Sequence, residues 1–309
     1  MKQKPGMTGA VKIKRKTEVK KLLFVWPMML YPLSLFAVFW VYKNISSFTM
    51  AFQSIDAFGK TSWAGLDNFK TFLYDIFQNE SDTILRTAVI RSLLMYGVNL
   101  LISMPLYIFF SYAIYKKCPG HALWRFLMML PNIISAFIFG LLFKRFANGP
   151  IASLFSWDTP LRSAGTAFPL ILFYMIWVSF GTNMLVYSNA MKEVDDAVKE
   201  SAKLDGVSGM LSELRYVLIP SIFPTISTFL IVGVAGFLMQ SGPLVMFYMY
   251  NAPGYVYTTG YYFTVRIFNT PNQTGYPALA AGGLIITAVT VPVVMTVRRA
   301  LEKLGPSVE

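Results

Sequence analysis

The chain has 309 residues, of which 55% are hydrophobic, 16% aromatic and only 14% charged. This composition is typical of proteins that cross a membrane several times, and it argues against a soluble globular domain. The single cysteine, Cys118, excludes an intramolecular disulfide. The net charge of +12 does not by itself indicate nucleic-acid binding, because the basic residues are placed as membrane topology requires.

Charge-free runs predict the membrane spans, because a crossing helix needs about 20 apolar residues and a central charge costs about 2.5–3.5 kcal/mol. The fifth run becomes rich in Gly, Pro and Tyr after residue 240, which predicts one span at about 218–239 followed by an outer excursion. The sequence therefore predicts an all-α membrane protein with six transmembrane helices. In chain order the runs are 22–42, 92–115, 126–143, 163–191, 216–265 and 267–297.

The distribution of Lys and Arg predicts the orientation of these spans. With the N-terminus inside the cell, the inner segments hold 18 basic residues and the outer segments hold 8. An excess of positive charge marks cytoplasmic segments, so both termini are expected in the cytoplasm. The predicted domain organisation is a basic cytoplasmic tail at 1–21, a six-span domain at 22–299 and a cytoplasmic tail at 300–309.

The segment 192–215, between the fourth and fifth spans, is charged and differs from its surroundings. It holds six acidic and four basic residues, a poor match for anionic lipid and a better match for a protein partner. Small and β-branched residues recur there at helical spacing, and Gly206 is expected to end that helix. On composition alone, a solvated loop without a partner is the alternative. The predicted face consists of Val194, Ala197, Val198, Ser201 and Ala202.

The order of residues in this segment resembles the cytoplasmic signature of ABC importer permeases. In that signature Glu-Ala-Ala-x-x-Asp-Gly precedes a hydrophobic-x-Leu-Pro ending, and this chain has "ESAKLDG" and then "VLIP". It departs from the signature by one serine and by about one extra residue before the proline. The resemblance implies a coupling helix at about 193–213 that docks on a cytosolic ATPase. The implied ATPase-coupling residues are Glu200, Ser201, Ala202, Asp205, Gly206 and Pro220.

Three further stretches resemble carbohydrate-type permeases such as the maltose permease. They are "WAGLDNFKTFL" at 63–73, "WRFLMMLPNIISAFIFGLLFKRF" from Trp124, and "NAPGYVYTTGYYFTVRIFN" at 251–269, so the likeness covers about 22–299. The resemblance implies the type I ABC importer permease fold and transport of a sugar or oligosaccharide across the cytoplasmic membrane of a bacterium.

The chain lacks a plausible nucleotide site of its own. Gly59-Lys60-Thr61 is the one fragment similar to a phosphate-binding loop, but Ser54 stands where that loop requires glycine. No cofactor is therefore expected in this chain, which is predicted not to be an enzyme. The resemblance implies that ATP and Mg bind to two separate ATPase subunits, with a second permease subunit and an extracytoplasmic solute-binding protein as further partners.

Polar and aromatic side chains inside the spans are candidates for the substrate pathway, because hydrocarbon penalises polar groups unless they face a cavity or a neighbour. The alternative for the amides is hydrogen bonding between helices, and for the aromatics packing. The candidates for the pathway are Asn99, Asn132, Tyr174, Trp177, Asn183, Phe237 and Gln240.

Two other kinds of transporter are alternatives to a sugar permease. A permease for amino acids, peptides or polyamines remains open. An ion-coupled transporter is disfavoured, because no charge-free run contains Asp, Glu or His.

Overall fold

The computed structural model describes residues 24–79, 83–270 and 273–305. Within these residues, four helices are long and apolar enough to cross a membrane: Phe24–Met50, Ile84–Tyr115, Ala167–Lys192 and Tyr276–Leu304. Two bent helix pairs pass the same test, and counting each pair as one span gives six. The predicted helical membrane fold is thus confirmed, and the spans follow the order of the charge-free runs. The predicted tail at 1–21 lies outside the described residues.

Both bends coincide with prolines. His121–Ile133 and Ala136–Leu154 meet at 107°, and Pro131 lies inside the first of these helices, two residues before it ends. Met210–Ser221 and Phe223–Gly236 meet at 70°, where Ile222 leaves helical geometry between two proline-containing turns. Proline lacks the N–H that a continuing helix needs and its ring crowds the preceding turn, so each span breaks there.

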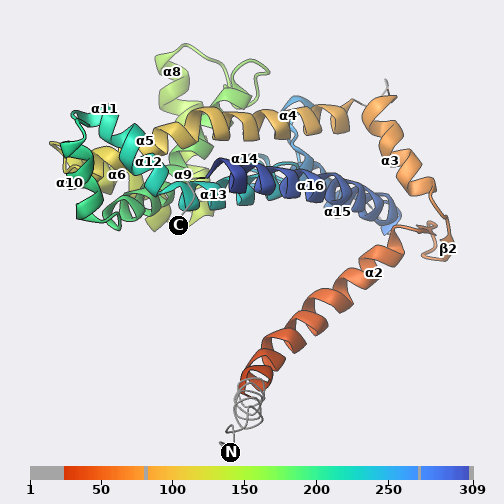
Figure 1. Ribbon diagram of the computed structural model, residues 1–309. Coiled ribbons are helices and arrows are strands. Elements are labelled where there is room, and N and C mark those ends of the chain that lie inside the picture. The colour runs from red at the N-terminus through yellow and green to blue at the C-terminus, as the bar shows by residue number, and fades with distance from the viewer. Residues whose placement is uncertain (1–23, 80–82, 271–272, 306–309) are drawn as a thin grey trace, which may run out of the picture.

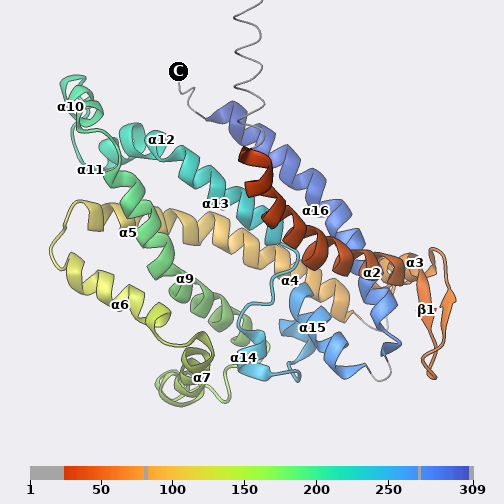
Figure 2. The same ribbon diagram turned by 90° about the horizontal axis from the view of Figure 1, so that it is seen from below.

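The first span stands apart from the rest of the molecule. Figure 1 shows it leaving the body at an angle, while the other long helices lie together, and Figure 2 shows the same body from below. None of its most apolar 18-residue window is buried. Its far end, α2 (Tyr42–Met50), contacts the last helix, α16 (Tyr276–Leu304). A π-helical stretch, η1 (Phe36–Val41), precedes α2 within this span.

A short hairpin follows the first span, and the sequence did not predict it. Strands β1 (Gln53–Ile55) and β2 (Thr61–Trp63) pair antiparallel. The Asp56 side chain accepts hydrogen bonds from the backbone N–H groups of Phe58 and Lys60, which fixes the turn. The fragment Gly59-Lys60-Thr61 lies in this turn, where Gly59 adopts a φ of +78°.

The central helix is α9 (Ala167–Lys192), which packs on α5 (Met104–Tyr115) and α6 (His121–Ile133). Its two halves enter different apolar clusters. The first half contributes Ile171 and Tyr174 to one cluster, and the second half contributes Met184 and Met191 to another. The elements of the first half of the chain that complete the body are α3 (Asp67–Phe77), α4 (Ile84–Val98), η2 (Asn99–Ser103), α7 (Ala136–Phe146), η3 (Ala147–Ile151) and α8 (Ala152–Leu154).

The outer excursion expected after the fifth span is a packed unit rather than a loose loop. Several of its tyrosines are buried, among them Tyr248, Tyr261 and Tyr262. The last helix then runs to Leu304, past the end of the charge-free run. The elements after α9 are α10 (Asp196–Leu204), α11 (Met210–Glu213), η4 (Leu214–Leu218), α12 (Ile219–Ser221), α13 (Phe223–Gly236), α14 (Leu244–Tyr248), η5 (Gly254–Val256) and α15 (Thr259–Asn269).

Candidate functional site

The segment between the fourth and fifth spans, residues 193–213, forms a projecting unit that we call the interspan stub. It consists of α10, a turn and α11. Figures 1 and 2 place it at one end of the body, with α3 and the hairpin at the other end. The candidate docking residues thus lie far from α3 and the hairpin.

Local sequence fixes both ends of α10. The side chain of Asp195 caps its start by accepting a hydrogen bond of 3.0 Å from the Ala197 N–H. At its end Gly206 adopts a φ of +87°, and backbone N–H groups of Gly206 and Val207 donate to carbonyls of the last turn. This is the glycine-terminated Schellman arrangement, as predicted for Gly206. Val194 lies before the cap, so the small-residue face is shorter than predicted.

The small-residue face of α10 borders a groove of about 480 Å³ against the start of the fifth span. Ser201, Ala202, Asp205 and Pro220 all line it, so four of the six residues that match the permease signature meet in one place. Gly206 stands at the turn, where an added Cβ would meet nothing among the described residues within 4 Å. The groove is completed by Ala197, Val198, Tyr216, Val217 and Ser221.

Large apolar side chains are exposed around the stub. Leu204 is 89% exposed and Leu211 71% exposed, and Val198 and Met210 are also exposed. Clustered exposed apolar side chains at a projecting tip are typical of a protein–protein contact. Since the small face leaves room for close approach, the stub offers both a groove and apolar contacts to a partner.

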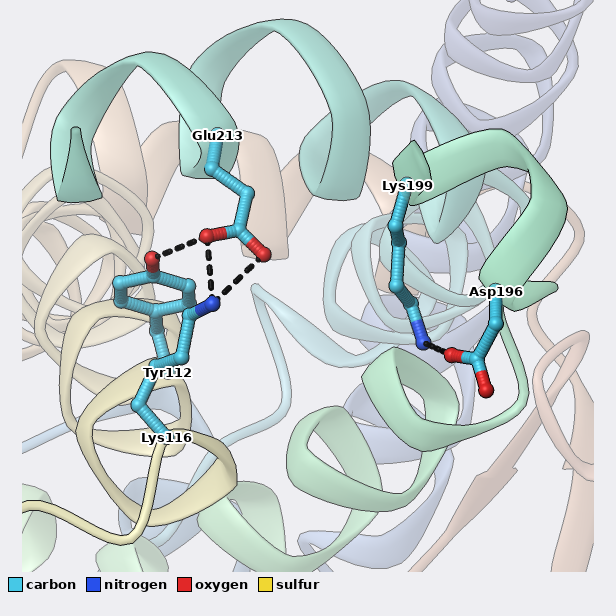
Figure 3. Close-up of polar contacts among 5 residues, drawn as sticks. All are labelled: Tyr112, Lys116, Asp196, Lys199 and Glu213. Carbon is cyan, nitrogen blue, oxygen red and sulfur yellow. Dashed lines mark hydrogen bonds and ion pairs between the residues drawn. The ribbon is translucent and has the colours of Figure 1, made fainter. Parts of the chain in front are cut away.

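Lys199 attaches α10 to the end of α5. Its Nζ lies 2.9 Å from Asp196 Oδ1 and 5.5 Å from the centre of the Tyr115 ring (Figure 3 shows the ion pair). The Lys199 side chain is 13% exposed, whereas that of Asp196 is 89% exposed. Burial alone lowers the pKa of Lys199, but its hydrogen bonds with Asp196 and Tyr115 raise the pKa above the ordinary value. Lys199 therefore carries its charge at neutral pH.

Two of the pathway candidates lie in one cavity among η2, α9 and α13. Asn99 and Asn183 line a volume of about 50 Å³, room for a few water molecules rather than a sugar ring. Asn183 Nδ2 also donates a hydrogen bond to the Ser179 carbonyl. Phe237 lies next to this cavity, with its ring centre 5.8 Å from that of Tyr96.

The sequence reasoning missed the tyrosines that line this cavity, Tyr96, Tyr107 and Tyr187. Tyr96, Leu100, Met104 and Tyr107 recur at intervals of three and four residues, and all four line the cavity. Helical spacing would have placed them on one face with the amide of Asn99 nearby. A search for polar and aromatic residues sharing a helix face could therefore have found them.

The other pathway candidates lie elsewhere. Asn132 ties α6 to α9, because its Nδ2 donates to the Val178 carbonyl and its Oδ1 accepts from the Thr182 hydroxyl. Tyr174 and Trp177 of α9 pack against rings of α7 and α14, in a set that we call the aromatic cluster. Its members are Phe139, Phe143, Tyr174, Trp177 and Phe247. Gln240 follows α13, and its buried Oε1 has no hydrogen-bond partner among the described residues. Asn132, Tyr174 and Trp177 thus occupy the settings expected for interhelical bonding and packing.

Curated relatives from Bacillus subtilis resemble this chain. The arabinooligosaccharides transport system permease protein AraP of Bacillus subtilis is 25% identical over 284 residues, which are 88% of this chain and 86% of AraP. The probable ABC transporter permease protein YesP of the same organism is 24% identical over 203 residues. That match covers 63% of this chain and 62% of YesP, so the chain spans less than two thirds of YesP.

Solved structures share the fold. A bacterial ABC transporter involved in import of the acidic polysaccharide alginate aligns with a TM-score of 0.72 and 21% identity, over 95% of this chain and all of that one. A bacterial alginate ABC transporter in complex with an alginate pentasaccharide-bound periplasmic protein aligns with a TM-score of 0.67 and 20% identity, over 91% and 94%.

A family model covers most of the chain. The model describing binding-protein-dependent transport system inner membrane components matches residues 84–304, a range that contains five of the six spans and the whole interspan stub. The chain is therefore a multi-pass membrane protein that belongs to the family of binding-protein-dependent transport system inner membrane components.

Proposed function

We propose that this chain is a non-catalytic permease subunit of an ABC importer that moves a sugar or oligosaccharide across the cytoplasmic membrane of a bacterium. Separate ATPase subunits, which bind ATP and Mg, supply the energy. The observation that carries the proposal is the interspan stub, with its lined groove and exposed apolar tip. The family supports import with a binding protein, and the names of AraP and the alginate transporter support a saccharide.

In this proposal both termini and the interspan stub lie in the cytoplasm. The tails at 1–21 and 300–309 flank the permease domain at 22–299, and the outer excursion faces the solute-binding protein. The excess of Lys and Arg in the inner segments supports this orientation. The unburied apolar first span supports contact with lipid or with a second, similar permease subunit.

The proposed mechanism is alternating access driven by packing rather than by chemistry on this chain. A pair of ATPase subunits closes on ATP and displaces the stub, and the spans behind it then open the cavity of Asn99 and Asn183 to one side at a time. The cavity is too small for a sugar ring as it stands, so opening is required before a sugar ring can pass. The contact residues are Glu200, Ser201, Ala202, Asp205, Gly206 and Pro220.

The docking role is tested by placing a bulky charge in the groove. Ala202→Arg should lower substrate-stimulated ATPase activity of the reconstituted transporter at least about tenfold, because an unpaired charge would enter a packed contact. Ala300→Arg, at an exposed position near the end of α16, is the matched control and should keep wild-type activity. Full coupling in the Ala202→Arg complex would refute the docking role.

The substrate class is tested by uptake into proteoliposomes that contain the whole transporter. Labelled oligosaccharides should accumulate only with ATP inside, whereas accumulation driven by an ion gradient would favour a secondary transporter. Uptake of amino acids, peptides or polyamines instead would reassign the substrate. Asn183→Ala should raise the KM for the sugar more than Asn132→Ala does, because only Asn183 lines the cavity.

A further inference from the structure

Glu213 joins the interspan stub to the second span. It is the last residue of α11 and faces the end of α5, as Figure 3 shows. Lys116 Nζ lies 2.6 Å from one carboxylate oxygen of Glu213 and 2.8 Å from the other. The Tyr112 hydroxyl donates a hydrogen bond of 2.9 Å to Oε2. We call these three residues the stub clamp; it joins positions about a hundred residues apart in the chain.

The clamp is partly shielded from water. The Glu213 side chain is 17% exposed and that of Lys116 is 34% exposed. Hydrogen bonds to an ionised carboxylate are shorter, stronger and more directional than neutral ones. A partly buried pair is also screened less by salt than the Lys199–Asp196 pair, both of whose residues lie within α10 and whose Asp196 side chain is 89% exposed. The clamp is thus the more robust of the two ion pairs on the stub.

The contacts beneath the clamp are of another kind. Tyr112, Met184, Leu214 and Leu218 belong to one apolar cluster that joins α5, α9 and η4. Apolar packing resists separation but is not directional, so it tolerates small sliding movements. The clamp adds the directional contact that fixes which turn of α5 lies against the stub.

The clamp lies on a continuous path from the groove to the cavity. Glu213 directly precedes η4, whose Val217 lines the groove on the stub. On the other side, α5 carries Met104 and Tyr107, which line the cavity that holds Asn99. A displacement of the stub that reaches α5 therefore changes the walls of that cavity.

We propose that Glu213 is a positioning residue for coupling: Lys116 and Tyr112 hold its carboxylate so that the stub and α5 move as one unit. This inference rests on the proposed docking of the stub on ATPase subunits. Without the clamp the ATPases still bind, but their closure moves the stub relative to α5. Less of this movement then reaches the cavity.

The test compares uptake of substrate per ATP hydrolysed in proteoliposomes that hold the complete transporter with its ATPases and binding protein. Glu213→Gln keeps the size of the side chain and removes its charge. It should lower uptake per ATP about threefold or more while the ATPases still copurify, since charge-assisted hydrogen bonds are lost. Asp196→Asn, which removes the pair confined to α10, is the matched control and should keep the wild-type ratio. An unchanged ratio for Glu213→Gln would overturn the proposal.

Exchange of the two charges separates positioning from general stability. Lys116→Glu and Glu213→Lys should each lower uptake per ATP, and the double variant should recover at least half of the wild-type ratio. A double variant no better than either single one contradicts the clamp. If Glu213→Gln fails to assemble, Tyr112→Phe replaces it; loss of one hydrogen bond should lower the ratio about twofold, and no change overturns the proposal.

The same assay distinguishes this inference from the proposed function. If Ala202→Arg leaves ATPase binding and coupling intact, the docking role itself fails. If Ala202→Arg uncouples the transporter while Glu213→Gln does not, docking stands and the clamp alone is refuted.

Discussion

The interspan stub and the aromatic cluster around α7, α9 and α14 are built in opposite ways. In the cluster, rings pack on rings: Phe247 is fully buried and its ring centre lies 5.0 Å from that of Tyr174 and 5.7 Å from that of Phe143. In the stub, no residue of α10 or α11 is buried, and leucines project into open space. One region is packed within this chain, whereas the other leaves large apolar side chains exposed.

Two glycines, one at each region, differ in why a glycine is needed there. Gly260, next to the cluster, is required for space, because an added Cβ would lie 2.3 Å from the Met239 carbonyl oxygen. Gly206, in the stub, has open space around it but adopts a φ of +87°. The proposed coupling surface thus lies outside the region whose packing stabilises the fold, so mutations should separate their effects on coupling and on stability.

The largest expected effect on stability comes from emptying the aromatic cluster. Phe247→Ala removes a fully buried ring and should lower the free energy of unfolding by about 3–5 kcal/mol, because it loses packing and leaves a cavity. Thermal unfolding of the purified transporter in detergent measures this. Leu204→Ala, at the exposed tip of the stub, should change the stability of the chain by no more than about 0.5 kcal/mol.

In a binding assay the order of the two effects should reverse, so that Leu204→Ala has the larger one. Leu204→Ala should weaken association with the ATPase subunits, because its side chain offers 89% of its surface to a partner. Phe247→Ala should keep that association wherever the protein remains folded. Equal losses of stability in the two variants would break the contrast between the regions.

Substitution of the two glycines is expected to have the next largest effect. Gly260→Ala forces a backbone clash between α15 and the turn after α13 and should destabilise by about 1–3 kcal/mol or more. Gly206→Ala meets no clash but keeps an alanine in the left-handed region, at a cost of about 1–2 kcal/mol. Thermal unfolding should register the first change, whereas hydrogen exchange of α10 should register the second. A larger global loss for Gly206→Ala would contradict this assignment.

The sequence predicted the spans well because insertion depends on the composition of one segment at a time. Charge-free runs located the four long helices and the two bent pairs, and Gly206 ended its helix as local backbone chemistry requires. The packed excursion could not be predicted in this way. Burial of Tyr248 and Tyr261 depends on neighbours from α7 and α9 that lie far away in the chain.

The residues of the candidate site also differ in whether local sequence could predict how they are arranged. The signature residues of the stub form a local motif, so their shared groove was within reach of the sequence. The stub clamp was not, because Lys116 and Glu213 are 97 positions apart and neither stretch marks the other as its partner. Among the pathway candidates, composition alone could not separate Asn183, which lines a cavity, from Asn132, which bonds two helices together.

The smallest expected effect concerns the start of α10. Asp195→Ala removes the side-chain oxygen that accepts from the Ala197 N–H and should cost about 1 kcal/mol of local helix stability. Asp195→Asn keeps a capping oxygen and removes only the charge, so α10 should remain protected from hydrogen exchange. Because no residue of α10 is buried, faster exchange in Asp195→Ala should be confined to residues 196–204 and leave the aromatic cluster unchanged. Faster exchange in α7 or α14 would mean that the two regions are mechanically connected, and would weaken the comparison on which these predictions rest.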